Sequence, residues 1–437
     1  MLRLNQLAQV DNNSSAIFQL SSDSEFAFVL ETILSLSNYG GASTGEVLRA
    51  ASQIAPGNFE SWYKEFKFLG DAIHAKASAL DTSRFPVSAR EAYFRSSTYY
   101  RNAPFFLHQN ASDQRINEVG ALAVEDFNKA AALLSLPVEN LNVPALSPSV
   151  PGDKFYVPAR FFKAQQGNQR LPTIILGTGY DAAQEDLYHE LGVSILERGW
   201  NVITYEGPGQ PTVLRDQKLG FIPDWWNVVS PIVDYLETRK DVETDYVALV
   251  GVSFGGQLAP LAASREHRLS AVLCIDGIND LYGRYRETLP TSLIELYEKG
   301  NYAAFDKELL EVEESSSTDT STRWGIAQSL FSFNTTSPSV WWGHLSKFSV
   351  NDTMLSNISC PVFIGEGEND SLAPGQAAHM ANVIGNKATY NLFRTDLGAG
   401  EHCQMGAEAQ LAQVTMDWLT DTWDHVSLPK NLTSVVD

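Results

Sequence analysis

The spacing of hydrophobic residues changes part-way along the chain. From about residue 24 to residue 135 the apolar positions recur every three or four residues, as in NFESWYKEFKFLGDAI, which is the period of a helix. A segment that opens with a capping-box pattern, Ser88 and Glu91, continues through AREAYFRSSTYYRNAPFFL with aromatic residues on more than one face. We therefore predict an all-helical domain over residues 1–150, containing one helix that is packed on two sides.

A proline-punctuated stretch, LPVENLNVPALSPSVPGD, ends this helical pattern because residues that precede proline disfavour the helical conformation. After it, short apolar runs alternate with helical stretches: FYVPARFF, TIILG, NVITY, YVALVGV, AVLCI, PVFIG and TYNLF. Such runs are typical of a mostly parallel sheet flanked by helices. With 437 residues the chain is also too long for a single core. We predict an α/β domain over residues 151–437.

The strand series is interrupted between about residues 282 and 355. This segment follows the predicted strand AVLCI and contains a helical pattern and the polar run ESSSTDTST. We predict a helical insertion there. Its tryptophans, Trp324, Trp341 and Trp342, suit either an aromatic substrate cavity or hydrophobic core.

The motif Gly251-Val252-Ser253-Phe254-Gly255 lies between the apolar run YVALV and a helix-compatible segment. A serine on a sharp strand-to-helix turn exposes its hydroxyl above the sheet, as in the α/β-hydrolase fold, whereas an ordinary turn would use this serine only to cap the helix. A serine nucleophile needs a base and an acid that orients the base. The motif thus predicts two further residues.

In the α/β-hydrolase fold the acid and then the histidine follow the serine along the chain. The stretch CPVFIGEGENDSLAPG supplies Asp370 at the turn after a strand, with Glu366 and Glu368 as rival carboxylates. Of the histidines after Asp370, His379 lies within a helical pattern and His425 near the chain terminus, while His402 falls in the glycine-rich segment GAGEHCQMG. We predict a catalytic triad of Ser253, Asp370 and His402.

Attack on a carbonyl generates an oxyanion, which needs two backbone N–H donors. We expect one from Phe254, directly after the nucleophile, and the other from Tyr180 or its rival Gly179 in the loop after TIILG. Further candidates for substrate binding are Asp280, Glu206 and Tyr282, although Asp280 is as well suited to cap a helix. No metal cluster, dinucleotide fingerprint or phosphate loop is visible, so we expect no metal and no cofactor.

The composition restricts the class of partner. The formal net charge of -21 repels phosphate backbones and anionic membranes, so we expect a small-molecule substrate and neither nucleic acid nor membrane. The first thirty residues lack a secretory signal pattern, and three scattered cysteines suit a reducing compartment. We expect a cytoplasmic protein.

These motifs resemble those of α/β-hydrolases with a helical N-terminal domain, similar to 2,6-dihydroxypseudooxynicotine hydrolase and to fungal hydrolases that shorten polyketide pigment precursors. The resemblance rests on AREAYFRSSTYYRNAPFFLH, PTIILGTGYD, YEGPGQ, GVSFGG, ENDSLAP and GAGEHCQMG. It implies that the helical domain is a lid over the active site, that the chain forms a homodimer, and that Ser253, Asp370 and His402 are the triad.

The resemblance further implies cleavage of a carbon–carbon bond next to a carbonyl, by a retro-Claisen reaction on a polyketide or aromatic ketone in secondary metabolism. The alternative is an esterase or acyltransferase, because the same residues cleave esters. A serine peptidase and a non-catalytic ligand-binding module rank below these, the latter because such a module has no need to keep all three triad residues.

Overall fold

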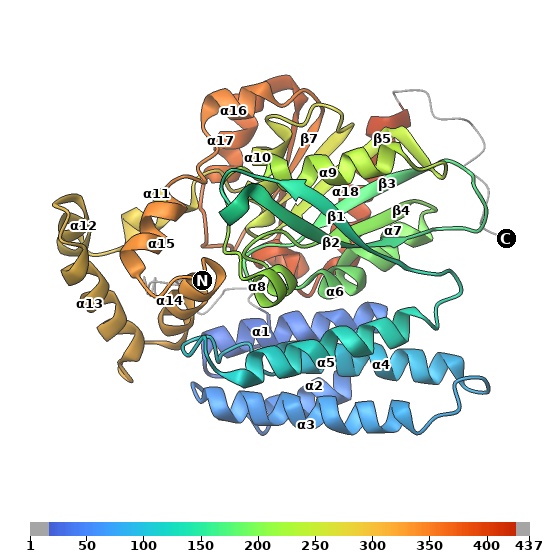
Figure 1. Ribbon diagram of the computed structural model, residues 1–437, viewed down its shortest axis with the longest axis horizontal. Coiled ribbons are helices and arrows are strands. Elements are labelled where there is room, and N and C mark those ends of the chain that lie inside the picture. Colours follow the sequence, from blue (N-terminus) through green and yellow to red (C-terminus); the bar gives the residue numbers. More distant parts are fainter. Residues whose placement is uncertain (1–16, 425–437) are drawn as a thin grey trace.

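The computed structural model describes residues 17–424, and its centre is a mixed sheet of eight strands (Figure 1). The strand order is β1-β2-β4-β3-β5-β6-β7-β8, in which β3 to β8 are parallel and β1 and β2 are antiparallel to their neighbours. The strands are β1 (Glu139–Leu146), β2 (Lys154–Phe162), β3 (Leu171–Gly177), β4 (Asn201–Tyr205), β5 (Val242–Val252), β6 (Ala271–Ile275), β7 (Val362–Gly367) and β8 (Ala388–Phe393).

The central strands are buried on both faces, which explains their continuous apolar sequences. Every residue of β3, β4 and β6 is buried. Successive side chains of β3 enter two different cores, with Ile174 and Leu176 on one face and Ile175 on the other. The seven strands predicted from apolar runs are thus confirmed.

Strand β1 lies in the proline-punctuated stretch that was predicted to end the helical pattern and was not predicted as a strand. It pairs with β2, with Val143 opposite Val157, and occupies the edge of the sheet. An edge strand tolerates Pro144 because one side of its backbone has no partner strand to bond. Part of the range predicted for the helical domain therefore belongs to the sheet.

Helices cover both faces of the sheet. Helices α9, α10 and α17 bury their apolar side chains against one face. Helices α7 and α18 and the turn η3 share the core of the other face. Their bounds are α6 (Gln184–Leu187), η3 (Tyr188–Gly192), α7 (Val193–Glu197), α8 (Pro211–Gln217), α9 (Trp226–Glu237), α10 (Gly255–Ala263), α17 (Gln376–Ile384) and α18 (Glu408–Asp424), with short 3-10 turns η1 (Leu36–Tyr39), η2 (Pro151–Asp153), η4 (Gly385–Lys387), η5 (Thr395–Leu397) and η6 (His402–Gln404).

The N-terminal helices form a layer beside the sheet (Figure 1). Their apolar side chains belong to the same hydrophobic core as one sheet face. Helix α4 is buried nearly all round, as predicted, but it begins with Pro86 at its first position and has no side-chain cap, so the predicted capping box of Ser88 and Glu91 is wrong. The bounds are α1 (Ser24–Ser35), α2 (Thr44–Ala51), α3 (Phe59–Ser78), α4 (Pro86–Asn102) and α5 (Gln114–Ala131).

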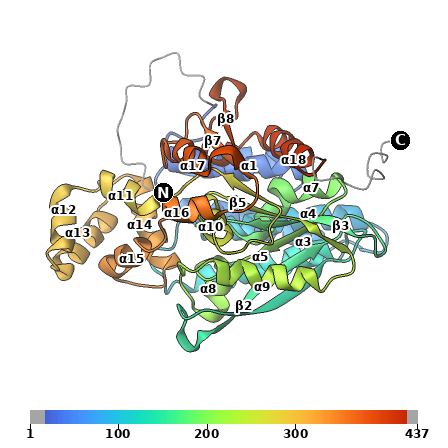
Figure 2. The same cartoon turned by 90° about the horizontal axis from the view of Figure 1, so that it is seen from above.

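The predicted insertion after β6 is helical. Most of it lies to one side of the sheet in both ribbon views (Figure 1 and Figure 2). Helix α14 of the insertion contacts the loop after β3. In this contact the Tyr180 hydroxyl donates to Ser329 Oγ at 2.8 Å. The helices of the insertion are α11 (Leu281–Thr288), α12 (Thr291–Glu298), α13 (Tyr302–Glu314), α14 (Thr320–Ser332), α15 (Pro338–Leu345) and α16 (Asp352–Asn357).

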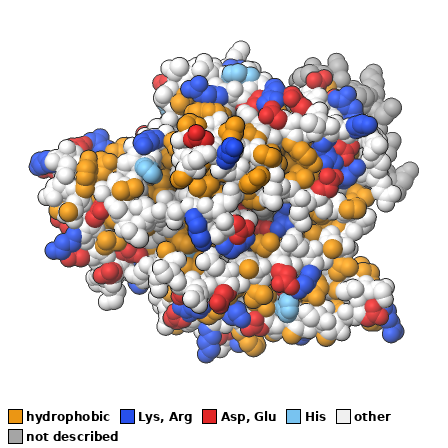
Figure 3. Space-filling model, in the orientation of Figure 1, with side chains coloured by type: hydrophobic (Ala, Val, Ile, Leu, Met, Phe, Trp, Pro, Cys, Tyr) orange, Lys and Arg blue, Asp and Glu red, His pale blue; other side chains and the backbone are white. Residues whose placement is uncertain are grey.

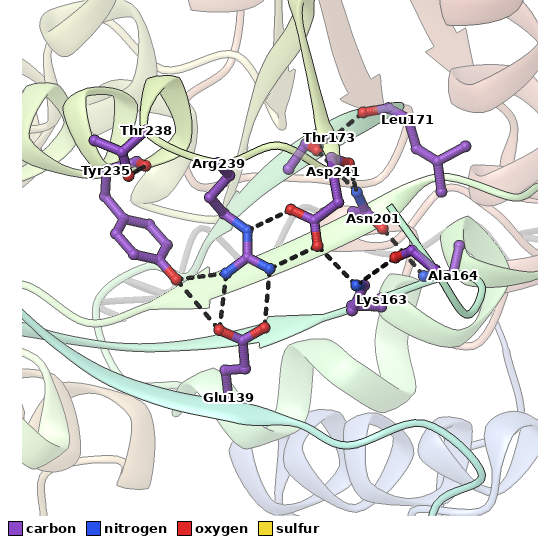
Figure 4. Close-up of polar contacts among 11 residues, drawn as sticks. Glu139, Lys163, Ala164, Leu171, Thr173, Asn201, Tyr235, Thr238, Arg239 and Asp241 are labelled. Atoms are coloured by element: carbon purple, nitrogen blue, oxygen red, sulfur yellow. Dashed lines mark hydrogen bonds and ion pairs between the residues drawn. The ribbon is translucent and has the colours of Figure 1, made fainter. Parts of the chain in front are cut away.

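A charged network ties the β1 edge to the rest of the sheet (Figure 4). Arg239, which follows α9, donates to Glu139 of β1 at 2.8 and 2.9 Å and to Asp241 at 2.8 Å. Lys163 after β2 pairs with Asp241 at 2.8 Å, and the guanidinium of Arg239 lies 3.8 Å from the ring centre of Phe161. Each charge in this network has at least one partner of opposite sign.

The surface carries charges of both signs. On the face drawn in Figure 3, acidic and basic side chains are interspersed with small hydrophobic patches, and neither sign forms a continuous field. Within residues 17–424, every helix is too short or too polar to cross a bilayer. Residues 1–16 lie outside the described residues, and they make up about half of the thirty N-terminal residues that lack a secretory signal pattern.

Candidate active site

Ser253 stands at the sharp turn between β5 and α10. Its φ of +60° lies in the left-handed region, where a residue with a side chain is strained. The turn is closely packed, because a Cβ on Gly251 would lie 2.0 Å from the carbonyl oxygen of Gly255, and one on Gly256 would lie 1.8 Å from that of Asp276. These glycines are therefore required by close backbone approach, and the turn presents the serine hydroxyl above the sheet.

The structure brings the three predicted triad residues together. The Ser253 hydroxyl lies 2.9 Å from His402 Nε2, and His402 Nδ1 lies 2.6 Å from Asp370 Oδ2. With the tautomer that this arrangement favours, Nδ1–H donates to the carboxylate and Nε2 accepts from the serine. His402 and Asp370 are buried, so a continuous hydrogen-bonded chain runs from the acid to the serine.

The rival residues lie elsewhere. Glu366 accepts a hydrogen bond from Tyr390 at 2.6 Å, and Glu368 accepts one from the backbone N–H of Thr395 at 2.8 Å. His379 pairs with Asp352 at 2.9 Å on the surface. His425 lies outside the described residues. Asp370 and His402 are thus the acid and histidine that the fold brings to Ser253.

Charge coupling within the triad favours an ionised acid and a basic histidine. Burial alone raises the pKa of Asp370, but the charge and hydrogen bond of His402 outweigh it and hold that pKa below its usual value. Burial alone lowers the pKa of His402, but the Asp370 carboxylate outweighs it and raises that pKa above the usual value. The pair is suited to accept the proton of Ser253.

A second carboxyl supports the histidine loop. Asp276, directly after β6, is 3% exposed and accepts from Gln404 Nε2 at 2.7 Å and from the backbone N–H groups of Cys403 and Gly367 at 3.1 and 3.2 Å. Burial and the nearby charge of Asp370 raise its pKa to about 7. Its hydrogen bonds fix the backbone at the end of β7 and the backbone next to His402.

The predicted oxyanion donors lie beside Ser253. A Cβ on Gly179 would stand 2.7 Å from the backbone nitrogen of Phe254 and 2.8 Å from Ser253 Cβ, so the two loops are in contact. The buried ring of Tyr180 meets that of Phe254 edge-on at 5.6 Å. Among the described residues, the backbone N–H groups of Phe254 and Tyr180 have no protein acceptor. Their role as donors, and the choice between Tyr180 and Gly179, stay predictions.

A narrow cavity lies over Ser253 and His402. One wall comes from α1, where Phe28 faces the His402 ring with centroids 6.4 Å apart. The other walls include Arg101 and Phe105 from the α4 region and Trp324 from the insertion. The helical N-terminus and the insertion both cover Ser253, so its hydroxyl is shielded from bulk water.

A larger cavity of about 540 Å³ lies next to the first between α4, α5, α8 and α14. Arg101, Phe105 and Asp181 line both cavities and therefore form the boundary between them. Arg101 is held by Asp186 at 2.8 Å and by a short hydrogen bond to the carbonyl of Asp181. Nothing in the sequence pattern marked these boundary residues.

The other candidates for substrate binding are not brought to the triad. Glu206 accepts from the backbone N–H groups of Gln184 at 2.9 Å and Thr212 at 2.6 Å. Asp280 caps α11 through the N–H of Gly283 at 3.0 Å, and Tyr282 packs on Trp342 with ring centres 4.7 Å apart. In the described part of the chain, neither cavity is lined by Glu206, Asp280 or Tyr282.

The insertion tryptophans divide between the two roles that their sequence suggested. Trp324 lines the cavity over the nucleophile, and its indole N–H donates to the carbonyl of Phe105 at 3.2 Å. Trp341 and Trp342 are 1% exposed and belong to the hydrophobic core. Only tertiary packing separates these cases.

Asp276, His402 and Cys403 form a compact set of donor atoms within 4.8 Å of one another. Asp276 and His402 are occupied by the hydrogen bonds described above. The Cys403 thiol donates to the carbonyl of Ile275 at 3.2 Å and lies 3.3 Å from His402 Nε2. We therefore assign the set to the support of the triad.

Curated relatives of this chain include fungal hydrolases. Hydrolase LUC6 of Fusarium sp is 28% identical over 417 residues, covering 93% of this chain and 98% of the relative. The 20-hydroxy-prefusarin hydrolase FUS2 of Gibberella moniliformis is 26% identical over 409 residues, covering 91% and 96%. No protein-family model matches the chain. The resemblance to fungal hydrolases is confirmed, and it supports an enzyme of the hydrolase class.

Among solved structures, that of 2,6-dihydroxy-pseudo-oxynicotine hydrolase matches with a TM-score of 0.68 at 20% identity, covering 89% of this chain and 95% of the other. At 20% identity this structural similarity supports a shared fold and no more. The chain has the α/β-hydrolase fold, with a helical N-terminal region and a helical insertion after β6, as its sequence predicted.

Proposed function

We propose that this protein is a serine hydrolase in which Ser253 attacks a carbonyl carbon, His402 is the general base and Asp370 orients the histidine. The observation that carries the proposal is the chain of hydrogen bonds from Asp370 to His402 at 2.6 Å and from His402 to Ser253 at 2.9 Å. An isolated serine hydroxyl is a weak nucleophile, and this arrangement activates it.

The bond cleaved is a carbon–carbon bond next to a carbonyl. As Ser253 Oγ bonds to the carbonyl carbon, its proton passes to His402 Nε2, and the oxyanion is stabilised by the backbone N–H groups of Phe254 and Tyr180. The carbon–carbon bond then breaks, its electron pair leaves as an enolate, and His402 returns the proton to the enolate carbon. Water, activated by His402, hydrolyses the acyl-enzyme to an acid.

The substrate is a polyketide or aromatic ketone of secondary metabolism. FUS2 and 2,6-dihydroxy-pseudo-oxynicotine hydrolase are each named for a small-molecule substrate. Phe28, Phe105 and Trp324 around the nucleophile suit an aromatic or conjugated molecule. The adjoining cavity of about 540 Å³ has room for the remainder of such a substrate.

The test uses purified wild type and Ser253→Ala with a panel of aromatic 1,3-diketones and aryl esters, followed by mass spectrometry. We expect the wild type to cleave diketones, and Ser253→Ala to lower kcat by about four to six orders of magnitude. Ser356→Ala, an exposed serine on α16, is the matched control and keeps full activity.

Other outcomes separate the alternatives. Cleavage of esters alone would replace carbon–carbon hydrolysis by ester hydrolysis or acyl transfer, which use the same triad. Equal activity of wild type and Ser253→Ala would reject Ser253 as the nucleophile. Tight ligand binding without turnover in either protein would favour a binding module.

A further inference from the structure

Two buried polar side chains in the cavity over Ser253 lack a hydrogen-bond partner. Among the described residues, Glu190 Oε1 and Thr178 Oγ1 have no partner, although both residues are at least 96% buried. Both line the same cavity as Ser253 and His402. A buried polar atom without a partner costs free energy, so such atoms in an active-site cavity indicate contacts that a substrate completes.

Glu190 lies in the π-helical turn η3 and is 4% exposed. Its neighbours along the cavity include Ile33 and Leu36 of α1 and Met405 of the histidine loop. The charged groups that act on it are Glu408, Asp186 and His402. The carboxyl therefore lies close enough to His402 to be affected by its charge, and no ion pair of Glu190 occurs within residues 17–424.

This environment favours the neutral acid. Burial, followed by the charges of Glu408 and Asp186, raises the pKa of Glu190 to about 8, against a smaller lowering by His402. At pH 7 the side chain is therefore mostly a carboxylic acid, with one O–H group to donate. A carboxyl kept neutral by an apolar site is a strong hydrogen-bond donor to a developing enolate.

Glu206 shows how a structural glutamate differs. It is fully buried, yet its carboxyl accepts hydrogen bonds from the backbone of Gln184 and Thr212 and joins the starts of α6 and α8. Glu190 Oε1 has no hydrogen-bond partner among the described residues. The difference assigns Glu206 to the fold and leaves Glu190 open to a ligand.

We propose that Glu190 is a further catalytic residue, which donates a hydrogen bond to the second carbonyl oxygen of a 1,3-dicarbonyl substrate. This inference rests on the proposed serine hydrolase function. It narrows the substrate to compounds with an oxygen two carbons away from the carbonyl carbon that Ser253 attacks.

The contribution falls on one step. When the carbon–carbon bond breaks, its electron pair becomes the enolate, and negative charge gathers on the second oxygen. The O–H of Glu190 stabilises that charge without giving up its proton, and the proton that completes the ketone product comes from His402. Thr178 Oγ1 provides a further hydroxyl donor in the same cavity.

The test compares Glu190→Met, which removes the donor, with Glu190→Gln, which keeps an N–H donor. For a 1,3-diketone we expect Glu190→Met to lower kcat about 100-fold and Glu190→Gln less than about tenfold, as for other oxyanion donors. For an aryl ester without a second oxygen, both variants stay within about threefold of wild type. Glu311→Met, exposed on α13, is the matched control.

Equal losses on ester and diketone would show that Glu190 acts through His402, and no loss on the diketone would show that it does nothing; either result overturns the proposal. If Ser253→Ala is as active as wild type, the proposed serine hydrolase function is rejected, and not only the role of Glu190. Thermal unfolding of each variant identifies losses that come from misfolding.

A second measurement does not depend on how Glu190→Met folds. In Ser253→Ala, binding of an enolisable 1,3-diketone should shift the infrared C=O band of a protonated carboxyl, and this band should be absent in Ser253→Ala with Glu190→Gln. Absence of a protonated carboxyl that responds to the diketone would overturn the proposal.

Discussion

Two clusters of charged side chains, one at the β1 edge and one at the triad, use aspartate in opposite ways. At the edge, Asp241 is bonded by Arg239 and Lys163, which outweigh the effect of burial and lower its pKa to about 2. Beside His402, the hydrogen-bond partners of Asp276 within the described chain are Gln404 and two backbone N–H groups, and burial with the charge of Asp370 raises its pKa to about 7.

This contrast in hydrogen-bond partners distinguishes a charged network that supports the fold from polar groups around Ser253. The edge network of Glu139, Lys163, Arg239 and Asp241 pairs each charge with an opposite one (Figure 4). In the cavity over Ser253, Glu190 Oε1 and Thr178 Oγ1 have no hydrogen-bond partner among the described residues. A network in which every charge is paired stabilises the fold, whereas buried polar groups without hydrogen-bond partners are candidates for substrate contacts.

The largest expected effect is on the triad. Asp370→Asn preserves shape but no longer holds His402 in the required tautomer, so kcat should fall about 10⁴-fold with little change in unfolding temperature. Steady-state kinetics and thermal unfolding measure both quantities. Asp352→Asn, whose partner is the exposed His379, is the matched control. A fall of less than tenfold would contradict the assigned role of Asp370.

The pH dependence should also reflect the triad. Ser253 requires a neutral His402, so kcat/KM falls as the pH drops through the pKa of His402. Because Asp370 raises that pKa, we expect the acid limb of the kcat/KM profile above pH 6.5. In Asp370→Asn the limb should move to lower pH, and an unmoved limb would show that another group controls it.

Next is the stability of the edge network. Arg239→Met leaves Glu139 and Asp241 without their shared cation, and we expect a loss of about 3 kcal/mol in the free energy of unfolding. Denaturant unfolding measures it. Arg286→Met breaks an exposed pair with Glu298 and should cost less than about 1 kcal/mol. Similar losses of unfolding free energy in both variants would show that the edge network stabilises the fold no more than an exposed ion pair does.

Asp241 should make this stability dependent on acid. Its pKa is lowered in the folded state, so its contribution is present above the unfolded pKa of about 4 and is lost as the pH falls towards about 2. The difference in unfolding free energy between wild type and Asp241→Asn should therefore be constant above pH 5 and shrink below pH 4. A constant difference down to pH 2 would exclude the ion pairs as its origin.

The smallest effect concerns the contact between the loop after β3 and the insertion. Tyr180→Phe removes the hydroxyl that donates to Ser329 and should lower the free energy of unfolding by about 1 kcal/mol. The backbone N–H of Tyr180, the predicted oxyanion donor, is unchanged, so kcat should stay within about tenfold. A loss of 100-fold or more would mean that α14 positions the loop.

Much of the fold and the triad could be predicted because their signals are local. Buried parallel strands carry continuous apolar residues, and the turn at Ser253 needs glycines where backbones approach closely. The glycine-rich segment around His402 and the turn at Asp370 follow strands in the order that the fold requires. Strand β1 was missed as a strand, because prolines obscure the pattern of an edge strand.

The rest of the site escaped prediction because it is assembled from distant segments. Arg101, Asp181 and Glu190 come from α4, the loop after β3 and η3, and no spacing along the chain connects them. Asp280 and Glu206 follow strands as functional residues often do, but their oxygens are bonded to nearby backbone N–H groups. The position of a carboxylate after a strand does not by itself distinguish a substrate-binding residue from one that caps a helix or loop.

The sequence by itself determined the succession of seven strands along the chain, the turn at Ser253 and the placing of Asp370 and His402 beside it, because local patterning and chain order specify them. The tertiary structure decided which polar groups are saturated. Burial and charged partners set the pKa values of Asp241 and Asp276 apart, whereas Glu206 and Glu190 differ in their hydrogen-bond partners, and both differences arise only once the chain has folded around these residues.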